Sequence, residues 1–466
     1  MDLLLVHLSW IEYCFHTQKQ QPQTEPKPDA FVPSRLGTSF GTNPTTFHPL
    51  QTIETSTNLH PRTYSLLPPS GNIHDYYSLS PYWWPDCSNV HNTTALTEQQ
   101  ISDQCNYVVR DGQFNPDRTI VNDTGAFATL SVAVYYNVLA WRITGDEQYA
   151  ETASSFIDTW FLNNATAMTP NLEYSQVVRG PNGSKTGTHL GVLDLHCFTK
   201  IASAIQVMRD AKATAWTSAR DTAMVAWTTQ YSNWLLNNPI SLGEKASLNN
   251  HGTFWFAQAA SVQILIGDLT GATNILHEYF DGIYKNQINA TGDQPLEAVR
   301  TLPYHYRAYN IGGILCINRI AEYLGWNAWD ITTTAGKTVQ DATNFAMTQN
   351  NTENGDLSEM YPNVAAVASH YGDPSGKYST YLAQHDPVYP GEAWFFYNQP
   401  LSNSNINVAL DASGTILLSN GTSNSSSSST TGGSGGSKSA ASVYKPSLGL
   451  AMTTLGALGA TLWLAL

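Results

Sequence analysis

Residues 124–144, TGAFATLSVAVYYNVLAWRIT, repeat apolar side chains at helical spacing and stop at Gly145-Asp146. A period near 3.6 residues places such side chains on a common face, and a glycine just after the last periodic residue is typical of a helix end. We therefore predict a helix here, and it is the first of a series that decides the fold.

The same periodicity recurs along most of the chain, and glycine, proline or asparagine separates most of the segments. No alternation of strands and helices is visible, and no short repeat occurs. Paired helices of this length predict an all-α fold, an (α/α) toroid whose inner and outer helices alternate around a central cleft. Residues 350–420 are less helical and receive no assignment. The further helices are expected at residues 147–162, 191–209, 217–236, 251–267, 270–284, 306–324 and 335–348.

Before the first helix lies a segment with an unusual composition, residues 70–86, SGNIHDYYSLSPYWWPD. Its five aromatic residues, its His-Asp pair and its two prolines fit neither a core strand nor a helix. We expect an ordered loop whose rings and polar tips line a surface. Sugars bind such surfaces, because a pyranose ring offers an apolar face and hydroxyl groups. The alternative is a proline-pinned aromatic cluster that closes one end of a core.

This segment resembles the signature SG-x-x-HDY-x-S-x-x-PYWWPD of the alginate lyase family. Two further blocks match in the same order: residues 249–251 (NNH) followed by Phe254-Trp255, and Arg300 followed by residues 303–307 (PYHYR). The resemblance runs from about residue 58 to 398. It implies the same (α/α) toroid and a polysaccharide lyase that acts on an acidic, uronate-containing glycan.

Cleavage of a uronate polymer by β-elimination needs three functions: a base for the C5 proton, neutralisation of the neighbouring carboxylate, and an acid for the departing O4. Side chains can supply all three, so no metal or other cofactor is expected. Asn250 and His251 at a helix N-terminus suit the neutralisation, and the resemblance implies this use. Arg300 would add a fixed positive charge. Alternatively, Asn249-Asn250 only caps the helix.

The resemblance also implies a tyrosine as base and acid. Tyr306 is preferred over Tyr309 and Tyr304. A phenol with an ordinary pKa of about 10 must be activated by a cationic neighbour. His251, Arg300 and Arg307 are the candidates.

Further residues are expected to contact the substrate. Arg179 and His189 belong to a glycine-rich loop that we place at the border of the cleft, although the loop is alternatively a glycosylated surface turn. The full set of expected substrate contacts is His74, Asp75, Tyr76, Tyr82, Trp83, Arg179, His189, Trp255, Tyr304, His305 and Tyr309.

The composition limits the class of partner. The 466-residue chain has a formal net charge of −14, which excludes nucleic acid as a partner. A polyuronate can bind only where local cationic groups overcome this field. Two other functions stay open: a non-catalytic wall or adhesion protein, and a glycoside hydrolase, which would need two opposed carboxylates. No pair stands out among Asp75, Asp86, Glu173 and Asp194.

The two ends indicate a secreted, lipid-anchored protein at the cell surface. Residues 1–20 resemble a signal peptide, although Asp2 and Glu12 are atypical. An apolar tail at 447–466 has the pattern of a glycosylphosphatidylinositol attachment signal, the alternative being a retained membrane helix. Between the ends we expect an extended arm at 21–57, the lyase-like domain at 58–420 and a Ser/Thr/Gly-rich stalk at 421–446.

Glycosylation and a disulfide agree with that location. Cys87 and Cys105 flank a polar loop and are the preferred disulfide, whereas Cys197 and Cys316 are either buried thiols or a second bridge. No cysteine or histidine spacing indicates a metal site. The expected glycosylation sites within the lyase-like domain are Asn92, Asn122, Asn164, Asn182, Asn289 and Asn350.

Overall fold

A computed structural model describes residues 66–91, 95–349 and 356–387, a few positions up to residue 395, and the backbones of 406–410 and 416–420. These residues form two compact units, the first ending at Asp356 and the second beginning at Leu357. The predicted signal peptide, arm, stalk and apolar tail lie outside the described residues, as do Asn92 and Asn350.

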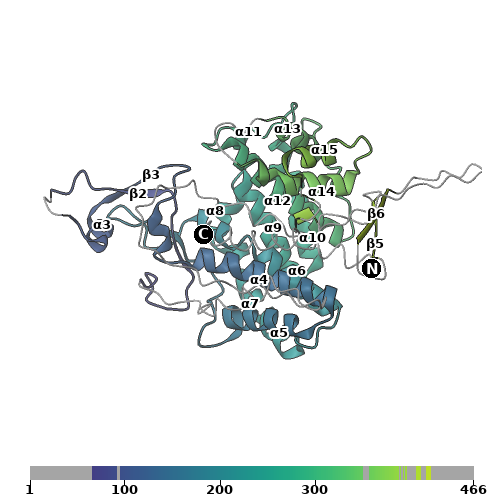
Figure 1. The fold of residues 1–466 in the computed structure, drawn as a ribbon. Helices are drawn as coiled ribbons and strands as arrows, with labels where there is room; N and C mark the ends of the chain where they lie inside the picture. Colours follow the sequence, from purple (N-terminus) through teal and green to yellow (C-terminus); the bar gives the residue numbers. More distant parts are fainter. Residues whose placement is uncertain are drawn as a thin grey trace, which may run out of the picture. The chain divides into compact units, whose positions relative to one another are not determined.

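The first unit is mostly helical, and its helices pack in pairs (Figure 1). This is the predicted (α/α) toroid. The bounds are α3 Glu98–Gln104, α4 Asp123–Thr144, α5 Glu147–Ile157, α6 Phe198–Asp210, α7 Ser218–Asn237, α8 Pro239–Lys245, α9 Asn250–Leu265, α10 Leu269–Asp281, α11 Pro295–Ala298, α12 Pro303–Tyr323 and α13 Val339–Ala346.

The turn between α4 and α5 shows how the sequence defines a helix pair. Gly145 adopts the left-handed conformation, with φ 73°, and its N–H donates to Trp141, which ends α4. The side chain of Asp146 accepts a hydrogen bond from the N–H of Gln148 and so caps α5. Two residues therefore reverse the chain, and the two helices pack against each other.

Helix α9 lies at the centre of the unit. It contacts α6, α7, α8, α10 and α12, and nearly all of its residues are buried. A helix that is apolar on all sides is stable only when other elements surround it. This position brings the N-terminus of α9 to the site described below.

The opening segment is not a continuous loop, contrary to the sequence-based expectation. It contains two short strands, β1 (Tyr77–Leu79) and β2 (Trp83–Asp86). Strand β1 pairs in parallel with β4 (Tyr174–Val177), and β2 pairs antiparallel with β3 (Asn106–Val109). Pro85 lies within β2, as proline can on an edge strand. The β2–β3 ribbon lies to one side of the helices (Figure 1).

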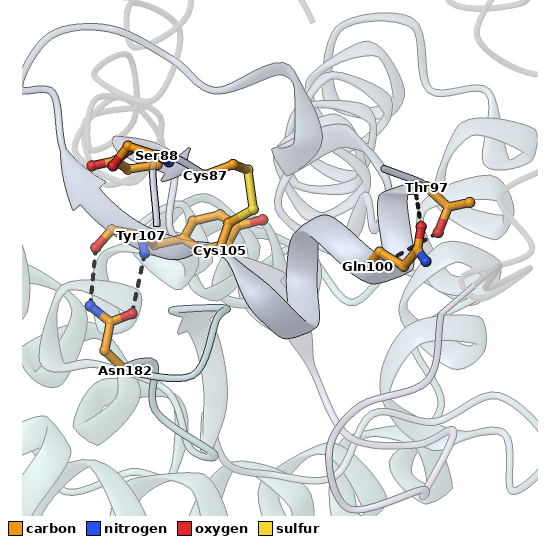
Figure 2. Close-up of a disulfide and its surroundings, with 8 residues drawn as sticks. Cys87, Ser88, Thr97, Gln100, Cys105, Tyr107 and Asn182 are labelled. Atoms are coloured by element: carbon orange, nitrogen blue, oxygen red, sulfur yellow. Dashed lines mark hydrogen bonds between the residues drawn. A yellow bond between two sulfur atoms is a disulfide. The ribbon is translucent and has the colours of Figure 1, made fainter. Parts of the chain in front are cut away.

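The predicted disulfide joins this ribbon. Cys87 follows β2 directly and Cys105 precedes β3, and their sulfur atoms are bonded (Figure 2). The ribbon is also attached to the loop after β4, because Asn182 accepts a hydrogen bond from the N–H of Tyr107 and donates to its carbonyl. Cys316 is a buried thiol and not part of a disulfide, so no Cys197–Cys316 bridge forms.

The second unit contains helices in a region that the sequence left unassigned. Helices α14 (Tyr361–Tyr371) and α15 (Lys377–His385) pack together, and the strands β5 (Ile406–Leu410) and β6 (Ile416–Asn420) form an antiparallel pair. Among the described residues, two helical stretches are long and apolar enough to cross a membrane, 123–144 and 189–210. Both are largely buried in the first unit, as core helices are.

Candidate active site

One buried carboxylate holds two histidines. Glu244, near the end of α8, accepts from His189 Nδ1 at 2.8 Å and from His251 Nδ1 at 2.5 Å, one through each carboxylate oxygen. The Glu244 side chain is 1% exposed, that of His251 17% and that of His189 46%. Because a carboxylate only accepts, both Nδ1 atoms carry the hydrogen, and the Nε2 atom of each ring is left for another partner.

The two histidines keep the carboxylate of Glu244 ionised. Burial alone would raise the pKa of Glu244, but His251 and His189 outweigh burial and lower it below the ordinary value. The hydrogen bond to Glu244 in turn raises the pKa of His189. A third histidine differs: burial lowers the pKa of His196 to about 4, so it stays neutral. The buried carboxylate is therefore ionised and favours a positive charge at the exposed ring.

A second buried carboxylate holds the residue before His251. Asn250 donates to Glu297 through its backbone N–H and its side-chain Nδ2, both at 2.7 Å. Asn250 is fully buried, so its amide nitrogen is committed inside the protein. The structure therefore gives Asn250 a positioning role at the N-terminus of α9. It does not show the direct, exposed amide that the sequence suggested.

The neighbouring glycine is required for this arrangement. A Cβ atom on Gly252 would lie 2.0 Å from the carbonyl oxygen of Ser247. The first turn of α9 therefore packs directly against the chain that enters it. Asn250 and His251 are thus fixed by the backbone and by two buried carboxylates.

Burial raises the pKa of Glu297, in contrast to that of Glu244. The partners explain the difference, since Glu297 is bound by a neutral amide and Glu244 by two imidazoles. Arg300 and His251 both lower the pKa of Glu297 electrostatically. The carboxylate therefore lies within electrostatic range of two of the predicted catalytic residues.

Tyr306, Tyr82 and Arg300 form the other side of the candidate site. The hydroxyl groups of Tyr306 and Tyr82 are 3.2 Å apart, and the ring of Tyr82 stacks on Phe114 at 5.2 Å. The guanidinium of Arg300 lies over the ring of Tyr306, 3.8 Å from its centroid, and donates to Asp111 at 3.1 Å. Arg300 therefore contacts the face of the ring, whereas Tyr82 contacts the hydroxyl group.

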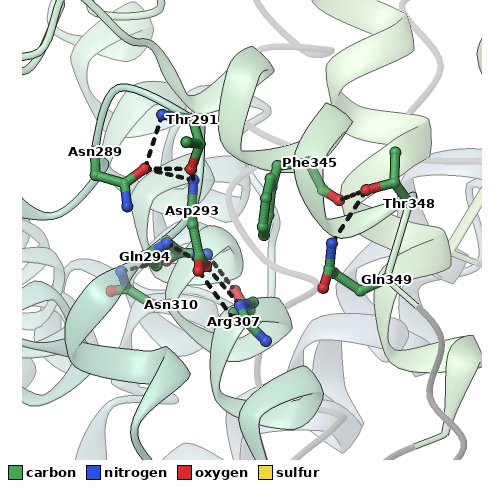
Figure 3. A network of polar contacts seen from close by, with 9 residues as sticks. All are labelled: Asn289, Thr291, Asp293, Gln294, Arg307, Asn310, Phe345, Thr348 and Gln349. Atoms are coloured by element: carbon green, nitrogen blue, oxygen red, sulfur yellow. Dashed lines mark hydrogen bonds and ion pairs between the residues drawn. The ribbon is translucent and has the colours of Figure 1, made fainter.

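The pKa of the Tyr306 phenol is shifted in the direction opposite to the expected activation. Burial, and then Tyr82, raise the pKa of Tyr306 well above the ordinary value, although Arg300 opposes the shift. Arg307 does not contribute, because it forms an ion pair with Asp293 and is directed into another network (Figure 3). Tyr306 is accordingly a protonated phenol when no substrate is bound.

The other two candidate tyrosines are as buried as Tyr306, since Tyr304 is 4% exposed and Tyr306 and Tyr309 are each 5% exposed. Tyr309 is buried, with its ring 4.3 Å from that of Phe254 and stacked on His305 at 6.0 Å. Its hydroxyl group has no hydrogen-bond partner among the described residues, and burial raises its pKa. Tyr304 is buried as well. The observation that favours Tyr306 is the contact of its hydroxyl group with that of Tyr82, which belongs to the opening segment.

Much of the opening segment is structural. Asp75 accepts hydrogen bonds from Ser70, Asn72 and Thr169, and His74 donates from Nδ1 to the carbonyl of Ala167 at 2.7 Å. These contacts shape the turn and attach it to the chain before β4. Tyr82 and Trp83, in contrast to the buried Asp75 and Tyr76, are part-exposed.

Tyr76 is also structural, because its hydroxyl donates to the buried carboxylate of Asp194 at 3.2 Å. Asp194 further accepts from Ser78 and Thr124, and from Gln176 at 2.8 Å, and so joins the opening segment to α4 and β4. Burial raises the pKa of Asp194.

Two further predicted substrate contacts serve the fold. Trp255 is buried in α9 and donates from its indole nitrogen to Ser241 at 2.8 Å. Arg179 forms an ion pair with Asp117 and lies over the ring of Tyr107, 5.0 Å from its centroid. Of the two residues expected in the glycine-rich loop, His189 is bound by Glu244 together with His251, whereas Arg179 is paired with Asp117.

Other predicted features can be located. Asn122, Asn164 and Asn182 are exposed and Asn289 is partly exposed. Among the described residues, no group of three His, Cys, Asp or Glu side chains could hold a metal ion.

Each of the four carboxylates considered for a glycoside hydrolase accepts hydrogen bonds from other residues of the protein. Asp75 and Asp194 are bound as described, and Glu173 accepts from Trp234 and Asn238. Asp86 is bound by the N–H of Ser88. No opposed pair of free carboxylates results among these four residues.

Sequence reasoning missed Glu244, Glu297 and Asp111, which hold His251, Asn250 and Arg300. Glu297 lies three residues before Arg300, and Glu244 lies in α8, a short helix beginning at Pro239 that was not predicted. The local sequence around these residues carries no signal of their roles, because Glu244, Glu297 and Asp111 lie among other polar or charged residues and most of their partners are distant in the sequence.

Comparisons with known proteins identify the family of the chain. A family model described as alginate lyase matches residues 61–355, an interval that ends next to the boundary between the two units. An alginate lyase from Bacteroides ovatus has 27% sequence identity and a TM-score of 0.63, with 72% of this chain and 88% of that chain covered. An alginate lyase A1-III from Sphingomonas species A1 has 14% identity and a TM-score of 0.37, with 64% and 74% covered. A variant of alginate lyase A1-III complexed with a tetrasaccharide has 14% identity and a TM-score of 0.43, with 70% and 87% covered. No curated protein matches significantly.

Proposed function

Because the chain belongs to the alginate lyase family and is a polysaccharide lyase, we propose that it cleaves a uronate-containing, alginate-like glycan by metal-independent β-elimination. The observation that carries the proposal is the contact of Arg300 with Tyr306, together with the electrostatic coupling of Glu297 to both Arg300 and His251. A phenol, a guanidinium and an imidazole are therefore available in one region, and they cover the three functions that the elimination needs.

The reaction assigns one function to each side chain. His251 and Arg300 bind the carboxylate of the uronate and stabilise the negative charge that develops when the C5 proton leaves. Tyr306, as the phenolate, takes that proton. The electron pair of the C5–H bond forms the C4–C5 double bond, the C4–O4 bond breaks, and Tyr306 returns the proton to O4. Asn250, held by Glu297, fixes the first turn of α9 beneath His251.

Tyr306 must ionise before it can act as base. Its raised pKa means that only a small fraction of the phenolate is present without substrate. The neighbouring Arg300 is the group that favours this fraction. It remains charged, because burial lowers its pKa but Tyr306 and Asp111 outweigh burial and raise it.

We further propose that the enzyme acts at the cell surface, with a lipid anchor at the C-terminus. The exposed sequons at Asn122, Asn164 and Asn182 and the Cys87–Cys105 disulfide support entry into an oxidising compartment. The apolar C-terminal sequence after a Ser/Thr/Gly-rich stretch supports the anchor. Release of the protein from intact cells by a phosphatidylinositol-specific phospholipase would test it, and retention on the membrane would contradict it.

The experiment for the activity is an absorbance assay on a panel of polyuronates. The C4–C5 double bond absorbs in the ultraviolet, so a rising signal identifies both the elimination and the polymer. The rate should be unchanged after treatment with a chelator. New reducing ends without the absorbance would mean hydrolysis, and silence across the panel would contradict the proposed substrate class.

A further inference from the structure

Glu244 occupies a position that the proposed reaction does not by itself explain. Its side chain is 1% exposed, and the two partners described for it are the rings of His189 and His251. The three residues come from different elements, since His189 begins the 3-10 turn His189–Leu195, Glu244 lies in α8, and His251 lies in α9. Glu244 therefore joins three elements at one point.

We propose that Glu244 is the positioning residue of the site, and that it holds His189 and His251 as a paired receptor for the carboxylate groups of the substrate. The inference rests on the proposed function, which supplies the polyanionic substrate. It adds His189 to the binding surface and assigns Glu244 a role through both rings.

The geometry limits how far apart the two rings can lie. Both Nδ1 atoms bind oxygens of the same carboxylate, at 2.8 Å and 2.5 Å. The rings are therefore neighbours, and each has its Nε2 on the side away from Glu244. Fixing the Nδ1–H of a histidine sets its tautomer and its orientation, as second-sphere carboxylates do for histidines that bind metals.

Gly243 provides the space for His189. A Cβ atom on Gly243 would lie 3.1 Å from the Cβ and 3.6 Å from the Cγ of His189. The histidine thus packs against the backbone of α8 beside Glu244. A side chain at 243 would therefore require His189 to shift by a few tenths of an ångström.

The electrostatics give this arrangement a function. Glu244 raises the pKa of His189, which favours a half-exposed imidazolium in a protein with a formal net charge of −14. A local cation of this kind is what a polyuronate needs in order to approach such a surface. Hydrogen bonds from the two rings lower the pKa of Glu244 in return.

The other charged and titratable groups near His189 and His251 have interactions of their own. Tyr309 of α12 feels the charge of Glu244, and Lys245 is paired with Glu278 of α10 at 2.7 Å. Glu297 binds Asn250 and is electrostatically coupled to Arg300. Asp194 lies in the 3-10 turn that His189 begins, and burial raises its pKa. His196, which follows this turn, is neutral. None of these groups replaces Glu244 as the hydrogen-bond acceptor of the two rings.

The test uses Glu244→Gln in the whole protein, with Glu278→Gln as a matched control at an exposed carboxylate. Glutamine keeps the shape but offers one acceptor and removes the charge. The imidazole signals of His189 and His251 are followed by NMR as the pH is changed. Kinetics on the polyuronate that the wild type cleaves give kcat and KM over the same range.

We expect His189 to titrate at lower pH in Glu244→Gln than in the wild type, and at the wild-type pH in Glu278→Gln. We expect kcat/KM to fall by about 10- to 100-fold, the range for loss of a residue that orients a functional imidazole. Unchanged titration of both histidines in a folded Glu244→Gln protein would overturn the proposal, as would a loss of activity with an unshifted pH profile.

A second variant covers a failure of Glu244→Gln to fold. His189→Gln changes a half-exposed residue, and we expect KM for the polyuronate to rise several-fold while kcat is largely kept. An unchanged KM would overturn the role of His189. The NMR titration does not depend on turnover, so it tests the coupling even if no polyuronate is cleaved, an outcome that would refute the proposed function instead.

Discussion

The hydroxyl group of Tyr82 lies 3.2 Å from that of Tyr306, although 224 positions separate the two residues in the sequence. This contact connects the aromatic opening segment to the helix that carries the proposed base. The strand β2 begins directly after Tyr82, and α12 begins three residues before Tyr306. The two sequence blocks thus meet at a single pair of hydroxyl groups.

Replacing Tyr82 by phenylalanine removes this contact but keeps the stacking on Phe114. We expect the rise of kcat with pH to begin at lower pH than in the wild type, because Tyr82 is one of the groups that raise the pKa of Tyr306 and so reduce the phenolate fraction. The thermal midpoint should stay near that of the wild type. Wild-type kinetics in Tyr82→Phe would show that the reaction does not use the contact.

The pH dependence should separate the two titrating groups. Burial and Tyr82 raise the pKa of Tyr306, so the phenolate fraction grows as pH rises and kcat should increase, by at most about tenfold per pH unit. The hydrogen bond to Glu244 raises the pKa of His189, so its positive charge is lost as pH rises through that value and KM should increase. Steady-state kinetics between about pH 6 and 9 measure both. A kcat that falls with rising pH would argue against a phenolate base.

Glu297→Gln tests how Asn250 is held. Both oxygens of Glu297 accept from Asn250, whereas glutamine offers one acceptor and places an N–H₂ group against the other donor. We expect the free energy of unfolding to fall by about 1–3 kcal/mol, the cost of an unsatisfied buried donor. Urea unfolding measures this, with Glu278→Gln as control. Equal stability of the variant and the wild type would mean that the pair does not fix the N-terminus of α9.

Removing the disulfide should act mainly on the β2–β3 ribbon. The bond joins residues 18 positions apart, and a loop of this length corresponds to about 3 kcal/mol. In the double variant Cys87→Ser and Cys105→Ser, we expect faster hydrogen exchange in the ribbon and a higher KM, because Tyr82 lies at its start. Equal exchange rates in the ribbon would show that the other contacts, such as that of Asn182 with Tyr107, are sufficient.

The helices and the three sequence blocks could be predicted because each depends on local pattern. The residues 124–144 have an uninterrupted helical period, and the structure has a helix at 123–144. Helix α8 could not be predicted, since seven residues with Pro239 and Gly243 carry too little periodicity. The strands β1 and β2 were missed because their partners are distant or follow a long loop.

The site was predictable only in part, for a physical reason. His251, Arg300 and Tyr306 could be named from motifs, and the structure places Arg300 against Tyr306. Residue type alone could not separate a ligand-facing side chain from a structural one, as Trp255 shows. Which carboxylate holds which side chain depends on how helices pack, and this information is absent from the local sequence.

The most direct test of the account compares wild type and Tyr306→Phe in the ultraviolet absorbance assay on a polyuronate that the wild type cleaves. The account predicts that the double-bond signal is lost in Tyr306→Phe, while the circular dichroism spectrum and the binding of the polymer are retained. A folded Tyr306→Phe protein that cleaves at the wild-type rate would contradict it.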